Sequence, residues 1–221
     1  MIKLAPSILS ADFTRLGEEI KVMEKNSVEY LHIDVMDGIF VNNISIGVPV
    51  VKSISEFTDM VKDVHLMITK PERYVEAFAK AGADIINFHL EATENPSEVI
   101  SLIKSFGKRA AITIKPYTPY QDVLEYLADV EMVLIMGVEP GFGGQSLIEH
   151  SLENLKAVSD YIKENNLNTL VEIDGGINSE NFAKVVELGA DIVVVGSALF
   201  KTGDLNGEIQ RFNKIIEECE K

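Results

Sequence analysis

Cysteine and tryptophan are nearly missing from this chain of 221 residues, which contains one cysteine and no tryptophan. The single thiol, Cys219, excludes an internal disulfide and a zinc site built from several thiolates, and it is typical of a reducing compartment. Long apolar runs are missing as well. The longest, residues 132–138, contains a glycine and falls far short of the roughly 18 residues that a membrane-spanning helix needs. The first residues also lack the pattern of a signal peptide. We therefore expect a cytoplasmic protein that does not enter a membrane.

Positive charge is scarce, since 20 lysines and arginines face 35 aspartates and glutamates and the net charge is −15. A chain this acidic repels nucleic acids and anionic membrane surfaces, so we expect neither as a partner. It also repels anionic metabolites at long range. An anionic ligand would therefore have to be held locally, by backbone N–H groups or by a metal ion.

Short apolar runs rich in valine and isoleucine recur along the chain, with no linker or low-complexity stretch between them. Runs that are apolar at every position, rather than at alternate ones, are typical of parallel strands buried on both faces. Eight such runs occur, at residues 2–9, 30–35, 61–67, 85–90, 110–114, 132–136, 169–173 and 192–195. Helical spacing of apolar residues marks four of the intervening segments, residues 14–25, 71–81, 97–106 and 180–188.

Eight strand–helix units of about 28 residues each predict an α/β fold, a (β/α)8 barrel that occupies residues 1–221 as one domain. An open doubly wound sheet is the alternative. The even repetition of the units and the lack of a dinucleotide-binding fingerprint favour the barrel.

Four residues with metal-binding side chains stand where strands of this barrel would end, the edge at which such barrels carry their active sites. His32 and Asp34 share one face of the second strand, His65 ends the third strand, and Asp174 ends the seventh. Two imidazoles and two carboxylates suit a divalent cation such as zinc, iron(II), manganese or cobalt. Alternatively, the histidines are hydrogen-bonded interior residues and the aspartates cap loops.

Glycine-rich turns follow the sixth, seventh and eighth strands, at residues 140–145, 174–176 and 196–197. Glycine lets the backbone approach a ligand closely, and phosphate sites in this fold commonly form after the last two strands. These turns contain no lysine or arginine, so a phosphate would be held by N–H groups. Ordinary tight turns are the alternative.

Three methionines, Met36, Met67 and Met136, stand at the ends of the second, third and sixth strands. They either fill gaps in the core or form an apolar wall that keeps water from a reacting carbon. His89 and Glu91 stand at the end of the fourth strand, with no role assigned. Asp12 and Asp37 are expected to cap loops.

Over nearly its whole length the sequence resembles the ribulose-phosphate 3-epimerase family. The matching motifs are residues 5–13, 32–38, 63–67, 140–145, 174–176 and 196–197. This resemblance implies a (β/α)8 barrel that interconverts D-ribulose 5-phosphate and D-xylulose 5-phosphate in the pentose phosphate pathway. It also implies a homo-oligomer, either a dimer or a hexamer.

The resemblance further implies the role of each site residue. His32, Asp34, His65 and Asp174 would hold one divalent cation per chain, and Asp34 and Asp174 would also move the proton on opposite faces of C3. The sugar would contact Ser7 and His65. The residues around the phosphate would be Gly141, Phe142, Gly143, Gly144, Gly175, Gly176, Gly196 and Ser197.

The chain departs from the family pattern beside the sugar pocket, at Ile39, Asn42, Lys115, Gly137 and Glu139. These departures leave open a related activity, the 3-epimerisation of D-allulose 6-phosphate, which has one more carbon. A barrel that binds a sugar phosphate without catalysis is a further alternative. The pair of carboxylates argues against it, because simple binding does not need two of them across one pocket.

Overall fold

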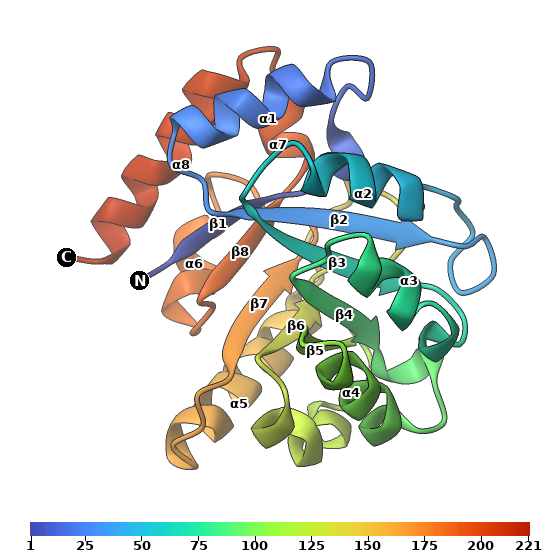
Figure 1. Ribbon diagram of the computed structural model, residues 1–221. Helices are drawn as coiled ribbons and strands as arrows, with labels where there is room; N and C mark the ends of the chain where they lie inside the picture. The colour runs from blue at the N-terminus through green and yellow to red at the C-terminus, as the bar shows by residue number, and fades with distance from the viewer.

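Eight parallel strands run side by side through the centre of the protein, and the computed structural model describes them together with all of residues 1–221 (Figure 1). Their order in the sheet is β1-β8-β7-β6-β5-β4-β3-β2. A parallel bridge between Ser7 and His32 brings β1 next to β2 and nearly closes the ring. The predicted (β/α)8 barrel is thereby confirmed. The strands are β1 Lys3–Pro6, β2 Tyr30–Met36, β3 Val61–Met67, β4 Ile85–His89, β5 Arg109–Ile114, β6 Met132–Met136, β7 Leu170–Asp174 and β8 Ile192–Val195.

Helices surround the strands on the outside of the barrel (Figure 1). A 3-10 segment, η4, occupies the place of a helix after β5. No helix combines the length and the apolar character needed to cross a membrane. The α-helices are α1 Leu16–Lys25, α2 Val48–Ser55, α3 Val75–Lys80, α4 Pro96–Ser105, α5 Glu149–Glu164, α6 Phe182–Glu187, α7 Ser197–Phe200 and α8 Leu205–Cys219. The 3-10 segments are η1 Ile8–Ser10, η2 Pro71–Arg73, η3 Leu90–Ala92 and η4 Tyr120–Asp129.

Two predicted segments each contain a 3-10 turn and are therefore much shorter in the structure than the apolar pattern suggested. The run at 2–9 is a strand only over Lys3–Pro6, since the chain turns at Ser7 into the 3-10 segment η1. The segment at 71–81 begins with the 3-10 turn η2, and the helix α3 starts only at Val75. The first of these differences matters for the site, because the early end of β1 leaves the Ser7 side chain facing β2.

The barrel strands bury both of their faces, but the two faces differ in chemistry. Outward-facing residues such as Leu31 and Ile33 of β2 join the large apolar core between strands and helices. Inside the barrel, apolar residues fill the end at which the strands begin. Toward the carboxyl ends the interior becomes polar, with the fully buried side chains of His32, Asp63, His65, Asn87, His89, Thr113 and Glu172. Burying polar groups is costly, and in this cluster both carboxyl oxygens of Glu172 and Oδ1 of Asp63 have no hydrogen-bond partner. The cluster marks the end of the barrel that carries the site.

Candidate active site

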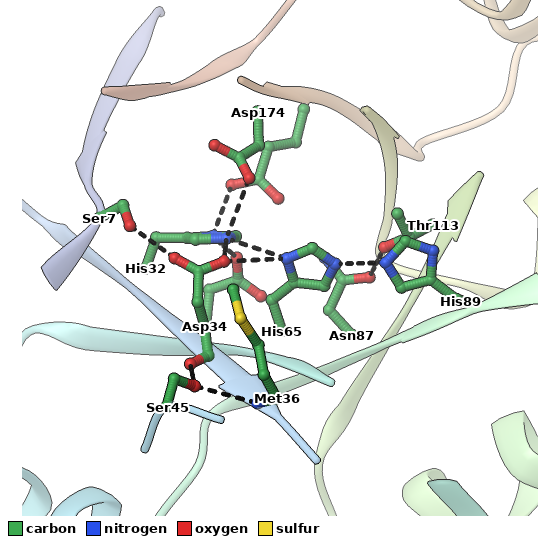
Figure 2. A network of polar contacts seen from close by, with 12 residues as sticks. Ser7, His32, Asp34, Met36, Ser45, His65, Asn87, His89, Thr113 and Asp174 are labelled. Atoms are coloured by element: carbon green, nitrogen blue, oxygen red, sulfur yellow. Dashed lines mark hydrogen bonds and ion pairs between the residues drawn. The ribbon is translucent and has the colours of Figure 1, made fainter. Parts of the chain in front are cut away.

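The four residues predicted to bind a metal converge at the carboxyl ends of β2, β3 and β7 (Figure 2). Asp34 Oδ1 lies 3.4 Å from His32 Nε2 and 3.3 Å from His65 Nδ1, and those two nitrogens are 3.3 Å apart. Asp174 Oδ2 lies 3.9 Å from His32 Nε2. One ligand-type atom of each residue therefore points at the same small region.

These separations would allow the four side chains to hold one small ion between them. Bonds of about 2.0–2.1 Å from a central ion to nitrogen and oxygen ligands put neighbouring ligand atoms about 3.3 Å apart. Three of the six separations among the four ligand atoms are 3.3–3.4 Å, and all four atoms lie within 4.8 Å of one another. The donor set of two imidazoles and two carboxylates fits a divalent cation of the zinc, iron(II), manganese or cobalt type.

The electrostatics of the cluster favour a positive charge at its centre. Burial opposes protonation of His32, but the Asp34 and Asp63 carboxylates outweigh it and hold the pKa of His32 well above its ordinary value. Burial likewise opposes ionisation of Asp34. The charge of His32 and hydrogen bonds from His32 and His65 nevertheless keep the pKa of Asp34 below its ordinary value. A proton and a divalent cation would therefore compete for the same place.

Asp174 differs from Asp34 in its surroundings. Its side chain is 17% exposed, against 3% for Asp34, and lies toward the open end of the barrel. Burial, followed by the negative charge of Asp34, raises the pKa of Asp174 to about 6. Ser7 donates a hydrogen bond to Asp34 Oδ2 at 2.5 Å (Figure 2). The two carboxylates thus approach the cluster from β2 and β7 with different partners.

Two buried carboxyl groups beneath the cluster were missed by the sequence analysis. Asp63 Oδ2 accepts a hydrogen bond from His32 Nδ1 at 2.6 Å, which directs His32 Nε2 toward the cluster. Glu172 Oε1 lies 3.7 Å from the same nitrogen. Burial, followed by the charge of Asp63, raises the pKa of Glu172 well above its ordinary value and so favours its neutral form. A signal for both existed, because each is an acidic residue inside an apolar strand, two positions before a predicted ligand.

A single pocket at the mouth of the barrel collects the remaining predicted site residues. Asp34 and Asp174 stand in its wall, whereas His32 and His65 are fully buried behind it. The three methionines at the strand ends line the pocket and are themselves almost fully buried. The other predicted residues in its lining are Ser7, Gly141, Phe142, Gly143, Gly144, Gly175, Gly176, Gly196 and Ser197.

The glycine turns at the pocket present backbone donors without internal partners. The N–H groups of Gly143, Gly176 and Gly196 donate to no backbone carbonyl of the chain. Gly176 also requires glycine for the fold, since its φ is +73° and a Cβ there would collide with the backbone of Leu147. Gly143 has no such requirement. A Cβ on that residue would meet only the Ser10 hydroxyl, at 3.4 Å.

One positively charged side chain from another part of the chain lies close to these turns. A Cβ placed on Gly144 would lie 2.9 Å from Nζ of Lys201, the residue that follows α7. The sequence analysis noted correctly that the turns contain no lysine or arginine, but it missed this lysine from the next element. An anion at the turns would therefore have one ammonium group nearby as well as the N–H groups.

The departures from the family pattern lie outside the pocket lining. Lys115 extends its ammonium group over the Phe40 ring, 4.2 Å from the ring centroid. Gly137 is needed for packing, because a Cβ there would collide with the carbonyl oxygen of Gly175. None of the remaining three departures, Ile39, Asn42 and Glu139, contributes to the wall. None of the five departures therefore places a side chain in the pocket wall.

Comparison with known sequences gives one consistent result. The model of the ribulose-phosphate 3 epimerase family matches residues 3–200. The chain is 48% identical over 205 residues to the ribulose-phosphate 3-epimerase of Bacillus subtilis, a match that covers 92% of this chain and 94% of that protein. It is 40% identical over 220 residues to the protein of the same name from Methanocaldococcus jannaschii, covering 99% and 93%.

Solved structures similar to the chain share its fold at low sequence identity. A mutant tryptophan synthase α-subunit from Pyrococcus furiosus aligns with a TM-score of 0.74 at 13% identity, over 97% of this chain and 100% of that one. A 3-hexulose-6-phosphate synthase aligns with a TM-score of 0.72 at 16% identity, over 97% and 99%. These likenesses concern the barrel alone. The family match and the sequence relatives go further: the chain belongs to the ribulose-phosphate 3-epimerase family.

Proposed function

We propose that this protein is an isomerase that interconverts D-ribulose 5-phosphate and D-xylulose 5-phosphate by epimerisation at C3. The observation that carries the proposal is the convergence of Asp34 and Asp174 with two buried imidazoles in one pocket, next to turns with free N–H groups. Membership of the family supports the same reaction. Nothing in the pocket lining favours the six-carbon alternative, since the departures that raised it lie elsewhere.

We propose one divalent cation per chain as the cofactor, held by His32, Asp34, His65 and Asp174. The ligand separations near 3.3 Å and the all-nitrogen-and-oxygen donor set support this assignment. When bound, such a cation supplies Lewis-acid stabilisation of the negative charge that develops on the two sugar oxygens.

The chain's own carboxylates move the proton in this proposal. Epimerisation beside a ketone removes the C3 proton from one face, which gives a planar 2,3-enediolate, and returns a proton to the other face. One base reaches only one face, so two are needed. Asp34 on β2 and Asp174 on β7 stand on different strands with two others between them, and can therefore flank a flat intermediate. The hydrogen bond from Ser7 holds Asp34 in its orientation.

The phosphate in this proposal binds the turns at Gly143, Gly176 and Gly196, with the Lys201 ammonium group beside Gly144. Backbone N–H groups and one cation suit a dianion in a protein whose overall charge repels it. The three methionines help to keep water from C3, since their side chains belong to the apolar lining of the same pocket.

Replacing Gly143 by alanine is expected to raise KM for the phosphorylated sugar several-fold and to change kcat little. The added methyl group fits the fold but stands where the phosphate must approach the backbone. Steady-state kinetics with D-ribulose 5-phosphate measures the effect. Gly47→Ala is the matched control, because Gly47 has an ordinary backbone φ of −120°, a Cβ there meets only Pro49 Cδ, at 3.7 Å, and the residue lies outside the pocket. An unchanged KM in the Gly143 variant would count against this phosphate site.

The choice of sugar is tested by supplying D-ribulose 5-phosphate and D-allulose 6-phosphate separately to the purified, metal-loaded protein. We expect kcat/KM to be larger for the pentulose phosphate. A preference for the hexulose phosphate would replace the proposed substrate, and no turnover of either would favour a barrel that only binds sugar phosphates.

A further inference from the structure

His89, at the end of β4, is fully buried and lies outside the pocket lining, yet it contacts the proposed metal site. Its Nε2 atom lies 2.9 Å from Nε2 of His65 (Figure 2). The two rings are stacked, with centroids 4.9 Å apart and planes inclined by 23°. The other nitrogen of His65, Nδ1, is the one that faces Asp34 and His32. His89 is therefore the hydrogen-bond partner of His65 on the side away from the metal ligands.

This geometry fixes where the protons must be when a metal is bound. A histidine binds a metal through a nitrogen that carries a lone pair, so His65 Nδ1 is bare and its proton is on Nε2. Only one proton fits between two nitrogens 2.9 Å apart. His65 Nε2–H therefore donates to His89 Nε2, and the proton of a neutral His89 is on its Nδ1.

The chain of contacts continues to a carboxylate at the edge of the barrel. His89 Nδ1 lies 3.4 Å from Oε2 of Glu91, in the 3-10 segment η3, within ion-pair distance, and it makes no hydrogen bond to any other group. The other oxygen, Oε1, accepts a hydrogen bond from the Lys115 backbone N–H at 2.8 Å and one from the Thr118 hydroxyl. The Glu91 carboxylate is thus tied to the loop after β5 and faces the one His89 nitrogen that has a proton to offer.

Packing holds His89 in this orientation. The Phe40 ring lies against it, with centroids 4.8 Å apart, and the Lys115 ammonium group lies over the Phe40 ring. Since His89 is 0% exposed, solvent cannot take over its hydrogen bond to His65.

We propose that His89 and Glu91 are positioning residues, a relay that holds His65 with Nδ1 toward the metal ion and thereby raises the affinity of the site. The proposal rests on the metal site proposed above. His32 has a direct carboxylate partner in Asp63, whereas His65 reaches its carboxylate through a second imidazole. Partners of this kind typically contribute about 10–100-fold to metal affinity.

The test measures the affinity of the metal-free protein for zinc and for cobalt(II), by competition with a chromophoric chelator. His89→Phe keeps a stacked ring but removes the acceptor, and it is expected to lower the affinity about 10–100-fold. His89→Gln retains an acceptor near the position of Nε2, and it is expected to recover most of that loss. His150→Phe is the control, since His150 is an exposed residue of α5 paired with Glu153, and its affinity should equal that of the wild type.

Glu91→Ala keeps the proposal testable if His89→Phe does not fold, because the Glu91 side chain is 23% exposed and lies at the far end of the relay. A several-fold loss of affinity is expected, together with an altered visible spectrum of the cobalt(II) form. Wild-type affinity in both His89→Phe and Glu91→Ala overturns the relay, and so does an equal loss in His89→Phe and His89→Gln. A wild-type protein that binds neither metal overturns the metal site itself, a different and separable result.

Discussion

Replacing Asp174 by asparagine is expected to lower kcat for epimerisation by at least about 10²–10⁴-fold, the usual contribution of a positioned general acid or base. Asparagine has nearly the same size but cannot accept the C3 proton. Asp34→Asn is expected to have an effect of the same order, because each carboxylate serves one face of the sugar. Both rates are measured with D-ribulose 5-phosphate at saturating metal concentration.

The metal content of these variants must be measured beside the rate, since both aspartates are also proposed metal ligands. Asp12→Asn is the matched control, because Asp12 is an exposed loop residue that accepts hydrogen bonds from Thr14 at the same end of the barrel. It is expected to retain the wild-type kcat. Full activity in a metal-loaded Asp174→Asn variant would contradict the acid–base assignment.

The second large effect is expected from His65→Ala, which should lose most of the bound divalent metal. The substitution removes Nδ1, the atom 3.3 Å from both Asp34 Oδ1 and His32 Nε2. The loss of affinity should exceed the roughly 10–100-fold loss typical of an orienting partner, since a ligand itself is removed. Elemental analysis after gel filtration measures it.

His150→Ala provides the comparison for that experiment, because it removes an exposed histidine of α5 that pairs with Glu153 and not with any proposed metal ligand. It is expected to retain the full metal content. His65→Ala with wild-type metal content and affinity would show that the ion, if present, is bound elsewhere.

The strands could be predicted because the barrel buries both faces of each one, which leaves a continuous apolar run in the sequence. β6 at Met132–Met136 and β8 at Ile192–Val195 match their runs. The end of β1 could not be predicted, since Ile8 and Leu9 continue the apolar run although they already belong to η1. An apolar run indicates that residues are buried, but it does not distinguish a strand from a buried turn.

The candidate site could be predicted in part, because spacing along a strand decides which face a residue occupies. The two-residue period of a strand, which places His32 and Asp34 on one face, also places Asp63 with His65 and Glu172 with Asp174. The contact between His65 and His89 depends on ring rotation and on pairing across β3 and β4, where His65 pairs with Asn87. The spacing of residues along the chain does not predict such contacts.

Features that depend on contacts between distant elements or between chains are harder to predict from the sequence. The Lys201 ammonium group lies near Gly144 because the fold brings the end of α7 close to the loop after β6. The homo-oligomer and the cytoplasmic location implied at the outset stay predictions, and so do the identity of the metal and the single-domain boundaries at 1–221.

The central claim is tested most directly by following D-ribulose 5-phosphate with the metal-loaded protein in heavy water by proton NMR. The account predicts that D-xylulose 5-phosphate appears and carries solvent deuterium at C3 from the first turnover, because the proton removed by one carboxylate is replaced from the other. The absence of D-xylulose 5-phosphate would contradict the proposed activity, and product that retains the substrate's own hydrogen at C3 would contradict the two-carboxylate mechanism.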